Sequence, residues 1–319
     1  MLIYCAIIGK ENYKLRMKII KKWKRSIYKR LLKLGLTSPK VVVLLDGGIC
    51  SQMNQYILGS LYLNKGYHVE YDLTFYDEWG MDLNNRFVRN FDLLKAFPYL
   101  SLDKASKNIT EIYKWKYYYK GNNTGERIYD FSFLDKTPPI YLGGYYHLPP
   151  DIWLSAFKSL YKLVPNVLDS ENQVICDQID QCPSSVAVHV RRGDLKVEMF
   201  DFGKPATNLY FENAVQYFKG KVHRPFFFFF SDEPDWVSQE LIPYLKLSLD
   251  ECKVIDINGS DRGYMDLYLI AHCKHQITSK GSLGKFGALL NDNPSKLVVL
   301  CDDEIEYSWK DLLSNPIFL

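Results

Sequence analysis

The chain has 319 residues, of which 47% are hydrophobic, and this is long for one compact domain and ample for two packed cores. No segment approaches the roughly 20 uninterrupted apolar residues of a membrane span. The seven cysteines are scattered without any Cys-x-x-Cys pair, and the closest two, Cys176 and Cys182, have no histidine near them in the sequence. We therefore expect free thiols in a reducing compartment and no structural metal.

The first forty residues are strongly basic. They hold twelve Lys and Arg and one acid, whereas the rest of the chain carries a net charge of −8. The apolar run at residues 2–8 is too short for a secretory signal, and we interpret it as a strand. Within residues 10–36, apolar side chains recur at three- and four-residue steps, which predicts an amphipathic helix with a lysine-rich face. The recurring positions are Ile20, Trp23, Ile27, Leu31 and Leu34.

Two readings of this basic helix remain open. Such helices lie on anionic membrane surfaces, which predicts a cytoplasmic protein held peripherally at the inner face of a membrane through residues 10–36. The alternative is an ordinary helix that docks into its own domain through the apolar stripe. We expect no nucleic acid partner, because the acidic remainder of the chain offers no extended basic groove.

Strands and helices alternate through the rest of the chain, which predicts an α/β fold. Two Rossmann-like domains are expected, residues 1–165 and 166–319, joined at the polar, proline-containing stretch 165–183. Residues 103–138, rich in Lys, Tyr and Asn, are interpreted as an excursion that forms either a flap or an edge hairpin. The strands expected in the first domain are 41–45, 68–73 and 140–145, with helices at 51–64, at 90–97 and after Pro150. The strands expected in the second are 186–190, 226–230, 253–257, 275–279 and 296–300, with helices at 207–218, 235–245, 262–272 and 282–291.

Charged residues follow one of the predicted buried strands directly. The sequence His189-Val-Arg-Arg-Gly-Asp194 continues from the apolar run 186–188. Ligands of doubly wound sheets bind just beyond the carboxyl ends of the strands. Arginine suits this place, because its planar fork grips phosphate oxygens and stays charged. The alternative is a solvated turn, or an Arg191–Asp194 pair that only closes a loop.

Two further strand ends carry polar groups. Gly47 and Gly48 stand between an apolar strand and a helix, where paired glycines let the backbone pass close to a ligand. Ser231 and Asp232 follow five consecutive phenylalanines, residues 226–230, which fit a strand covered on both faces.

Taken together, these segments resemble glycosyltransferase family 11, the inverting α-1,2-fucosyltransferases that use GDP-fucose. The resemblance covers about residues 41–300 and rests on four motifs in the family's order. The matching residues are Gly47, Gly48, Gln52, Met53, Gln55 and Tyr56; His189 to Asp194; Phe230, Ser231, Asp232 and Trp236; and Cys273, Lys274, His275, Gly287, Ala288, Leu290 and Asn291. The chain departs from the family at Cys50-Ser51 and at residues 279–286, where two tryptophans are missing.

The resemblance implies a GT-B-type fold, two Rossmann-like domains facing a cleft, and a donor site without a metal or other cofactor. By that resemblance Arg191 and Arg192 would hold the diphosphate of GDP-fucose, and His189 would brace the loop or the donor. Asp232 would accept from guanine, although it could equally cap the following helix. The other substrate-binding positions implied are Gly47, Gly48, Gln52, Asn54, Ser231, Gly281 and Ser282. The general base stays open among Asp46, Asp194, Glu198 and His147, with Asp194 also counted among the catalytic residues.

The function implied is transfer of L-fucose to the 2-hydroxyl of a galactose residue on a glycan, such as a lipid-linked precursor of a bacterial surface polysaccharide. The alternatives are another fucosyl linkage such as α-1,6 and a degenerate module that binds a nucleotide sugar without catalysis. A dinucleotide oxidoreductase is the weakest reading, because Gly47-Gly48 lacks the third glycine of Gly-x-Gly-x-x-Gly.

Overall fold

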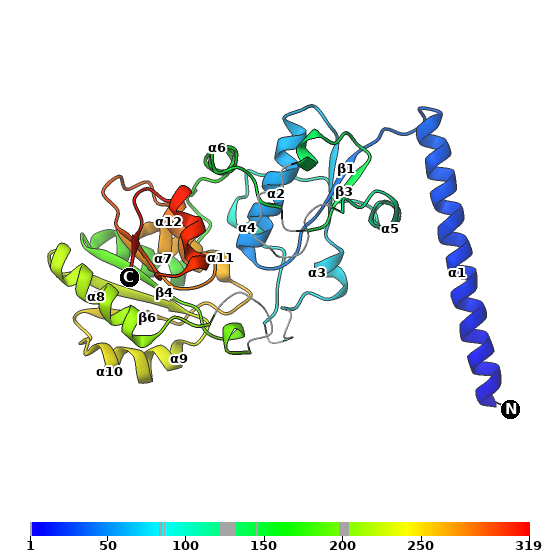
Figure 1. Cartoon of the computed structure of the whole chain (residues 1–319). Coiled ribbons are helices and arrows are strands. Elements are labelled where there is room, and N and C mark those ends of the chain that lie inside the picture. The colour runs from blue at the N-terminus through cyan, green and yellow to red at the C-terminus, as the bar shows by residue number, and fades with distance from the viewer. Residues whose placement is uncertain (1, 83–84, 86, 121–131, 145, 198–203) are drawn as a thin grey trace. The chain divides into compact units, whose positions relative to one another are not determined.

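The computed structural model describes residues 2–82, 85, 87–120, 132–144, 146–197 and 204–319, and the side chains of residues 2–17, 194 and 197 are not among the described parts. The chain forms two compact units, each with a parallel sheet of its own (Figure 1). The first unit comprises Met1–Leu45, Gln55–Thr74 and Leu102–Leu148, and the second comprises Asp46–Asn54, Phe75–Ser101 and Pro149–Leu319. The sequence had suggested one contiguous boundary at residues 165–166. In the structure the chain passes between the units several times.

The first unit is built on a three-stranded sheet in the order β2-β1-β3, which comprises β1 (Val41–Leu44), β2 (Val69–Asp72) and β3 (Ile140–Leu142). Both strand pairs are parallel, with Val42 opposite Glu70 and Tyr141. The helices along its chain are α1 (Leu2–Lys33), α2 (Ile49–Leu63), α3 (Thr74–Glu78) and α5 (Lys107–Lys116). Helices α2 and α3 each begin or end in the second unit.

The structure corrects two expectations in this unit. Residues 2–8 are helical and not a strand, because α1 runs unbroken to Lys33 and ends only at Gly35. Gly35 takes a left-handed φ of 67°, and the amide of Leu36 donates to the carbonyl of Leu31 at 2.9 Å, a glycine-dependent helix end. Within 103–138, where a flap or edge hairpin was expected, the structure has the helix α5 and a 3-10 turn at Ser132–Asp135, and residues 121–131 lie outside the described part. No described helix is long and apolar enough to cross a membrane.

The second unit is built on a six-stranded, wholly parallel sheet in the order β6-β5-β4-β7-β8-β9. Its strands are β4 (Ser185–Val190), β5 (Phe226–Ser231), β6 (Cys252–Ile255), β7 (His275–Thr278), β8 (Val298–Leu300) and β9 (Ile317–Phe318). Its helices are α4 (Leu93–Ala96), α6 (Pro150–Leu160), α7 (Ser170–Gln181), α8 (Asn208–Lys221), α9 (Pro234–Trp236), α10 (Ile242–Leu245), α11 (Gly263–His272), α12 (Leu283–Leu290) and α13 (Glu304–Tyr307). Helix α7 occupies most of the stretch that was expected to be a domain junction.

The phenylalanine strand β5 fills the core on both sides of this sheet. Phe227 and Phe229 pack with α8 in one buried cluster, and Phe228 and Phe230 pack with α7 and α11 in the other. Side chains of a strand alternate between faces, so an uninterrupted aromatic run requires cover on both faces. The strand predicted from this run is confirmed, and it places Ser231 at an edge of the sheet.

Candidate functional site

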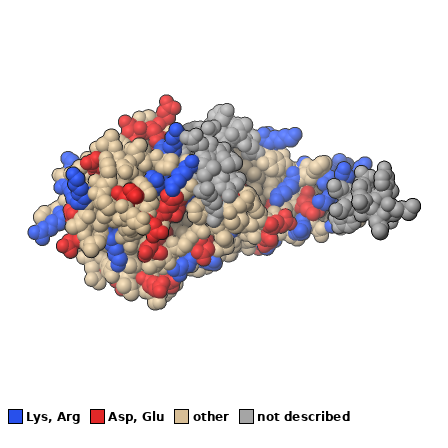
Figure 2. Space-filling model, turned by 90° about the horizontal axis from the view of Figure 1, so that it is seen from below, with Lys and Arg blue, Asp and Glu red and all other residues tan. Residues whose placement is uncertain are grey.

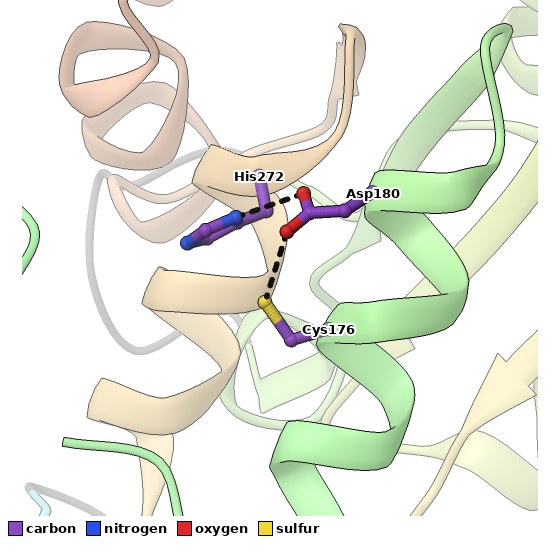
Figure 3. Close-up of side chains that lie close together, drawn as sticks. All are labelled: Cys176, Asp180 and His272. Atoms are coloured by element: carbon purple, nitrogen blue, oxygen red, sulfur yellow. Dashed lines mark hydrogen bonds and ion pairs between the residues drawn. The ribbon is translucent and has the colours of Figure 1, made fainter. Parts of the chain in front are cut away.

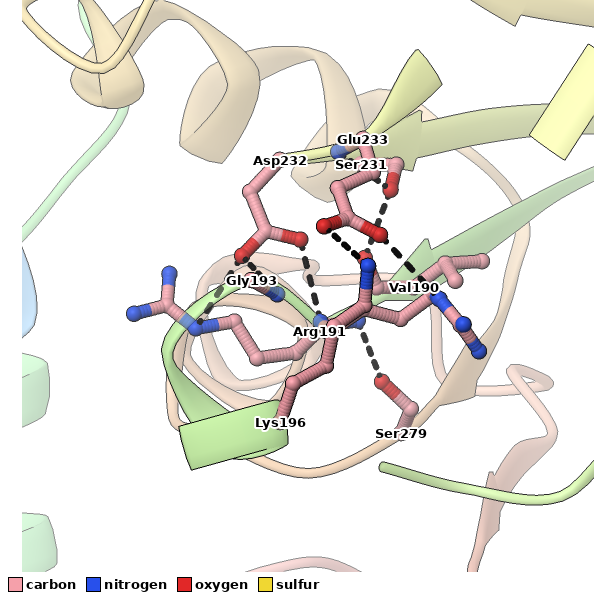
Figure 4. Close-up of polar contacts among 9 residues, drawn as sticks. Val190, Arg191, Gly193, Lys196, Ser231, Asp232, Glu233 and Ser279 are labelled. Carbon is pink, nitrogen blue, oxygen red and sulfur yellow. Dashed lines mark hydrogen bonds and ion pairs between the residues drawn. The ribbon is translucent and has the colours of Figure 1, made fainter. Parts of the chain in front are cut away.

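The candidate site lies at the carboxyl edge of the six-stranded sheet. Strands β5, β4 and β7 are neighbours, with Val190 opposite Ser231 and His189 opposite Thr278. Because parallel strands end at the same edge, the residues that follow these strands meet there. Figure 4 shows Asp232 and Ser279 reaching the turn after β4 from opposite sides.

Asp232 holds that turn through its backbone. One carboxylate oxygen accepts from the amide of Arg192 at 3.0 Å, and the other accepts from the amide of Gly193 at 2.9 Å. The second oxygen also lies 3.6 Å from Nε of Arg191, whose own amide donates to Oγ of Ser279 at 2.8 Å. Asp232 does not cap the next helix, since the amide of Glu233 donates to Oγ of Ser231 instead. Recognition of guanine by Asp232 stays a prediction. The expected Arg191–Asp194 pair involves the side chain of Asp194, which lies outside the described part.

Arg192 is fixed in its orientation by two contacts. Its Nε donates to Glu233 at 3.3 Å, and its guanidinium carbon lies 3.4 Å from the centre of the Trp236 ring. Glu233 also accepts from Lys196 at 2.5 Å, so its charge is shared between two cations. Within the described residues no hydrogen bond involves Nη1 or Nη2 of Arg192. Nη1 and Nη2 are therefore placed to donate to oxygens of a ligand, while stacking on Trp236 fixes the plane of the guanidinium.

His189 supports the turn from inside the sheet. The residue is only 4% exposed, and burial, reinforced by the positive charges of Arg191 and Lys285, lowers the pKa of its imidazole to about 3. Its carbonyl accepts from the amide of Ser279 at 3.1 Å. A Cβ on Gly284 would lie 2.8 Å from Cβ of His189, so helix α12 touches this residue directly. With a pKa this low the imidazole is neutral near pH 7, and the bracing role expected of His189 stays a prediction.

The loop from Ser279 to Ser282 is held by hydrogen bonds from a buried lysine. Nζ of Lys285 donates to the carbonyls of Ser279 and Gly281 at 2.8 and 2.6 Å, and it lies 2.6 Å from the carboxylate of Glu306. Lys285 and Glu306 are 1% and 2% exposed. The sequence showed Lys285 only as a departure from the family motif. The sign of this pair in the sequence was a lysine in the first turn of an otherwise apolar helix, with acidic residues some twenty positions later.

Gly281 and Ser282 lie at the amino end of α12. Gly281 is exposed with a φ of 81°, and the position of a Cβ on it would be 3.5 Å from the Arg191 side chain. Ser282 directly precedes the helix, where the free amides favour an anion. Both residues therefore stand beside the arginine turn, as expected for positions that contact phosphate.

The Gly47-Gly48 turn belongs to the same unit and lies next to this loop. The Cys50 thiol is hydrogen-bonded to the side chain of Ser282, and burial raises the pKa of this thiol to about 12 against the opposing effects of Ser282, Arg191, Lys285 and Arg89. A Cβ on Gly48 would lie 3.7 Å from Nη1 of Arg89. Arg89 is a cation of the site that the sequence did not single out.

Two residues expected to bind substrate make hydrogen bonds inside the second unit, and substrate binding by Asn54 stays a prediction. Gln52 is completely buried; its amide nitrogen donates to the carbonyls of Gly47 and Asn90, and its oxygen accepts from the amides of Asp92 and Leu93. Asn54 accepts from Nε1 of Trp153 at 2.8 Å. Gln52 has used both amide hydrogens and both lone pairs, so it shapes the glycine turn and has no capacity left for a ligand.

Four residues were left open as the general base, and none of them is assigned. Asp46 is half-buried at the start of the glycine turn, and His147 lies in the first unit. The side chain of Asp194 and all of Glu198 lie outside the described part.

One group in the described residues has the geometry to take a metal ion: Cys176, Asp180 and His272, whose ligand atoms lie within 4.8 Å of one another. Figure 3 shows Cys176 and Asp180 projecting from one helix toward His272 on another. Asp180 contacts Nδ1 of His272 at 3.0 Å and Sγ of Cys176 at 3.9 Å. The sequence missed this trio because His272 is distant along the chain. Helices α7 and α11 end here, ahead of β4 and β7, so the trio lies at the amino edge of the sheet and away from the arginines.

A parallel sheet with paired arginines, glycine turns and a helix amino end at its carboxyl edge is typical of proteins that bind a phosphorylated ligand. A family model described as glycosyl transferase family 11 matches residues 104–308. The chain belongs to this family.

The relatives are distant. An alpha-1,2-colitosyltransferase of Escherichia coli is 30% identical over 114 residues, which make up 35% of this chain and 38% of that enzyme, well under half of its length. Among solved structures, Arabidopsis thaliana FUT1 with GDP is 13% identical, with a TM-score of 0.45 over 86% of this chain and 73% of that one. POFUT1 with GDP-fucose is 12% identical, with a TM-score of 0.43 over 82% and 96% of the two chains. The fucosyltransferase NodZ from Bradyrhizobium is 13% identical, with a TM-score of 0.40 over 80% and 94%.

Proposed function

We propose that the protein transfers L-fucose from GDP-β-L-fucose, with inversion, to the 2-hydroxyl of a galactose residue on a glycan. The observation that carries this proposal is the turn after β4, where Arg191 and Arg192 are held in fixed positions at the carboxyl edge of the sheet. Family membership supports a sugar donor, and the His-Val-Arg-Arg-Gly-Asp motif supports a GDP-linked one.

The chemistry requires a counter-charge for the leaving group. As the bond from C1 to the diphosphate breaks, the sugar becomes oxocarbenium-like and negative charge collects on GDP. Groups that are positioned before the reaction and bind this charge more strongly in the transition state lower the barrier. Arg192, with its plane set by Trp236, supplies such a group, Arg191 lies beside it, and the amino end of α12 adds its dipole. The same set of side chains supports a mechanism that does not depend on a divalent metal.

Colitose is the second candidate donor sugar. The observation that favours it is the similarity to the colitosyltransferase of Escherichia coli, which covers 35% of this chain. Colitose is L-fucose without the 3-hydroxyl, so both sugars can share the GDP contacts described above. A site that binds the 3-hydroxyl with buried polar groups would reject colitose strongly, whereas an apolar site would discriminate weakly.

The test measures GDP release from GDP-fucose and GDP-colitose, each alone and with lactose as the acceptor, followed by assignment of the product linkage by NMR. Transfer from GDP-fucose to the 2-hydroxyl of galactose is the expected result, and GDP-mannose serves as the control donor. Preference for GDP-colitose would reassign the donor, and a product linked elsewhere, such as α-1,6, would reassign the acceptor position. Binding of GDP without turnover of any donor would identify a module that has lost catalysis.

A further inference from the structure

Helix α1 presents three different faces. Lys21, Lys24, Arg25 and Tyr28 contact α5: Lys21 lies 3.6 Å from Glu111, Lys24 donates to Asn108 at 2.6 Å, and the hydroxyl of Tyr28 is 2.9 Å from that of Tyr113. The guanidinium of Arg25 lies over the Trp115 ring at 4.3 Å. This is the face by which α1 docks onto its own unit, and Tyr28 is its buried centre, at 7% exposure.

The apolar stripe is not the docking face. Ile20, Trp23, Ile27 and Leu34 are 46%, 69%, 53% and 70% exposed. At 3.6 residues per turn they share one side of the helix, roughly a third of a turn away from Tyr28. The stripe therefore does not serve to hold α1 in its domain, and it remains uncovered although α1 is docked.

The third face is basic and borders the apolar stripe. It carries Lys22, Lys29, Arg30 and Lys33, all exposed. Residues 18–33 contain eight Lys and Arg and no acid. Burial, together with the neighbouring charges of Lys29 and Arg25, lowers the pKa of Lys116 on α5, a sign that positive charge gathers here. On the face shown in Figure 2, by contrast, acidic and basic side chains are interspersed over the second unit.

We propose that the exposed stripe and the basic face of α1 form one docking surface for an anionic lipid membrane. Trp23 and its apolar neighbours enter the headgroup boundary, and the lysines contact the lipid phosphates. A lipid surface fits both observations, because it is the partner that offers apolar and anionic groups side by side along a helix. If the proposed glycosyl transfer is correct, this surface brings the site to lipid-linked acceptors, and that last step alone rests on the proposed function.

The first experiment compares vesicle binding of charge variants of the full chain. Wild type should cosediment with equimolar phosphatidylglycerol and phosphatidylcholine and only weakly with phosphatidylcholine alone. Replacement of Lys22, Lys29, Arg30 and Lys33 by glutamine should lower the partition coefficient several hundredfold, since each base near the surface contributes about fivefold. The matched control replaces four exposed lysines of the second unit by glutamine, Lys158, Lys221, Lys246 and Lys310, and should bind like wild type. Binding should also fall when NaCl is raised from 0.1 to 1 M.

The second experiment tests the apolar stripe at constant charge. Trp23→Ser with Ile27→Ser should weaken binding at least about tenfold, and brominated lipids should quench wild-type tryptophan emission more than that of Trp23→Phe. Equal binding by the charge variant and its control, or equal binding to neutral and anionic vesicles, would overturn the proposal. So would a dimer in solution that Trp23→Ser dissociates, or retention on duplex DNA without binding to vesicles. Turnover of GDP-fucose on soluble lactose, measured for the same variants, reports separately on the proposed function.

Discussion

The Arg192 side chain is held by Glu233 on one edge and by the Trp236 ring on one face. A lysine keeps the charge but can neither stack as a plane nor offer two nitrogens to a phosphate. We expect Arg192→Lys to fold normally and to lose about 2–4 kcal/mol of transition-state stabilisation, measured as kcat/KM for GDP-fucose. Lys196→Gln, which removes the other cation on Glu233, is the control and should stay within a few-fold of wild type. Unchanged turnover in the lysine variant at saturating donor would exclude the diphosphate role.

His189 has a consequence for stability at low pH. Its folded pKa of about 3 lies below the value near 6.5 of an unfolded histidine. A depressed folded pKa contributes stability that is present above pH 6.5 and is lost as pH falls toward 3. The free energy of unfolding of wild type, relative to His189→Gln, should therefore be constant above about pH 7.5 and fall by up to about 1.4 kcal/mol per pH unit below 6.5.

Urea titrations between pH 5 and pH 8 measure this difference, with the exposed His223→Gln as the control. A difference that does not change with pH would mean that His189 is charged or reachable by water. For the same reason, no inflection in the pH profile of activity near neutrality should belong to His189.

How far single residues can be predicted depends on where their partners lie. The turn from His189 to Asp194 was found because it follows a strand end, a place in the fold that the strand itself fixes. The hydrogen bonds of Gln52 were not predicted, because its partners are backbone groups at 90–93, which no local pattern connects to it. Lys285 was missed because Glu306 comes to it only when α13 folds back.

At the scale of elements, the buried pair of Lys285 and Glu306 ties α12 to α13 and holds the loop of the site. Lys285→Met alone leaves a buried carboxylate and should cost roughly 3–5 kcal/mol of stability. The double variant Lys285→Met with Glu306→Leu removes both charges and should recover most of that loss. It should still raise KM for the donor, because the carbonyls of Ser279 and Gly281 lose their donor.

Urea unfolding and donor kinetics on both variants separate these effects. Donor kinetics in the double variant that equal those of wild type would show that the pair serves stability only.

Helices α11 and α12 cross at Gly287, where a Cβ would lie 2.4 Å from Cγ2 of Ile270. Gly287→Ala should therefore destabilise the protein by about 1–3 kcal/mol through overpacking, although alanine favours helices. Gly220→Ala in α8 has nothing within 4 Å and is the matched control, expected to be neutral or slightly stabilising. The midpoint of thermal unfolding is measured for both variants. Equal midpoints would mean that α11 and α12 can move apart with little loss of stability.

The sequence predicted the type of an element correctly where its apolar pattern matches the burial of that element in the fold. The strands β4 and β5 were predicted because they are apolar except at Ser185, His189 and Ser231, and they lie in the middle of a covered sheet. Residues 2–8 were misassigned because a short apolar run fits a strand or a helix equally well. They are helical because no helix-ending residue interrupts α1 before Gly35. Helix α7 was missed because its polar and charged surface resembles a linker, and its buried residues are few: Asn172, Ile175, Cys176 and Ile179.

At the scale of the whole molecule, the Cys176–Asp180–His272 trio and the arginine turn lie at opposite edges of the sheet. We therefore expect EDTA to leave turnover of GDP-fucose largely unchanged, since the proposed counter-charge for GDP is supplied by Arg191 and Arg192. Zinc added to the treated protein is the control and should also leave the rate unchanged. Loss of activity in EDTA that manganese restores would contradict the metal-independent proposal.

The repeated passage of the chain between its two units has a consequence for synthesis on the ribosome. Residues 46–54 and 75–101 are made early, yet the side chains that enclose them, such as Tyr268 over Ala96 and Phe97, are made some 170 residues later. At about 5–20 residues per second, the nascent chain exposes these apolar segments for roughly ten to thirty seconds before their sheet can form. The first unit has all of its residues once Leu148 is made, whereas the second must wait for Pro149–Leu319, and a chaperone on the emerging chain has this interval in which to act.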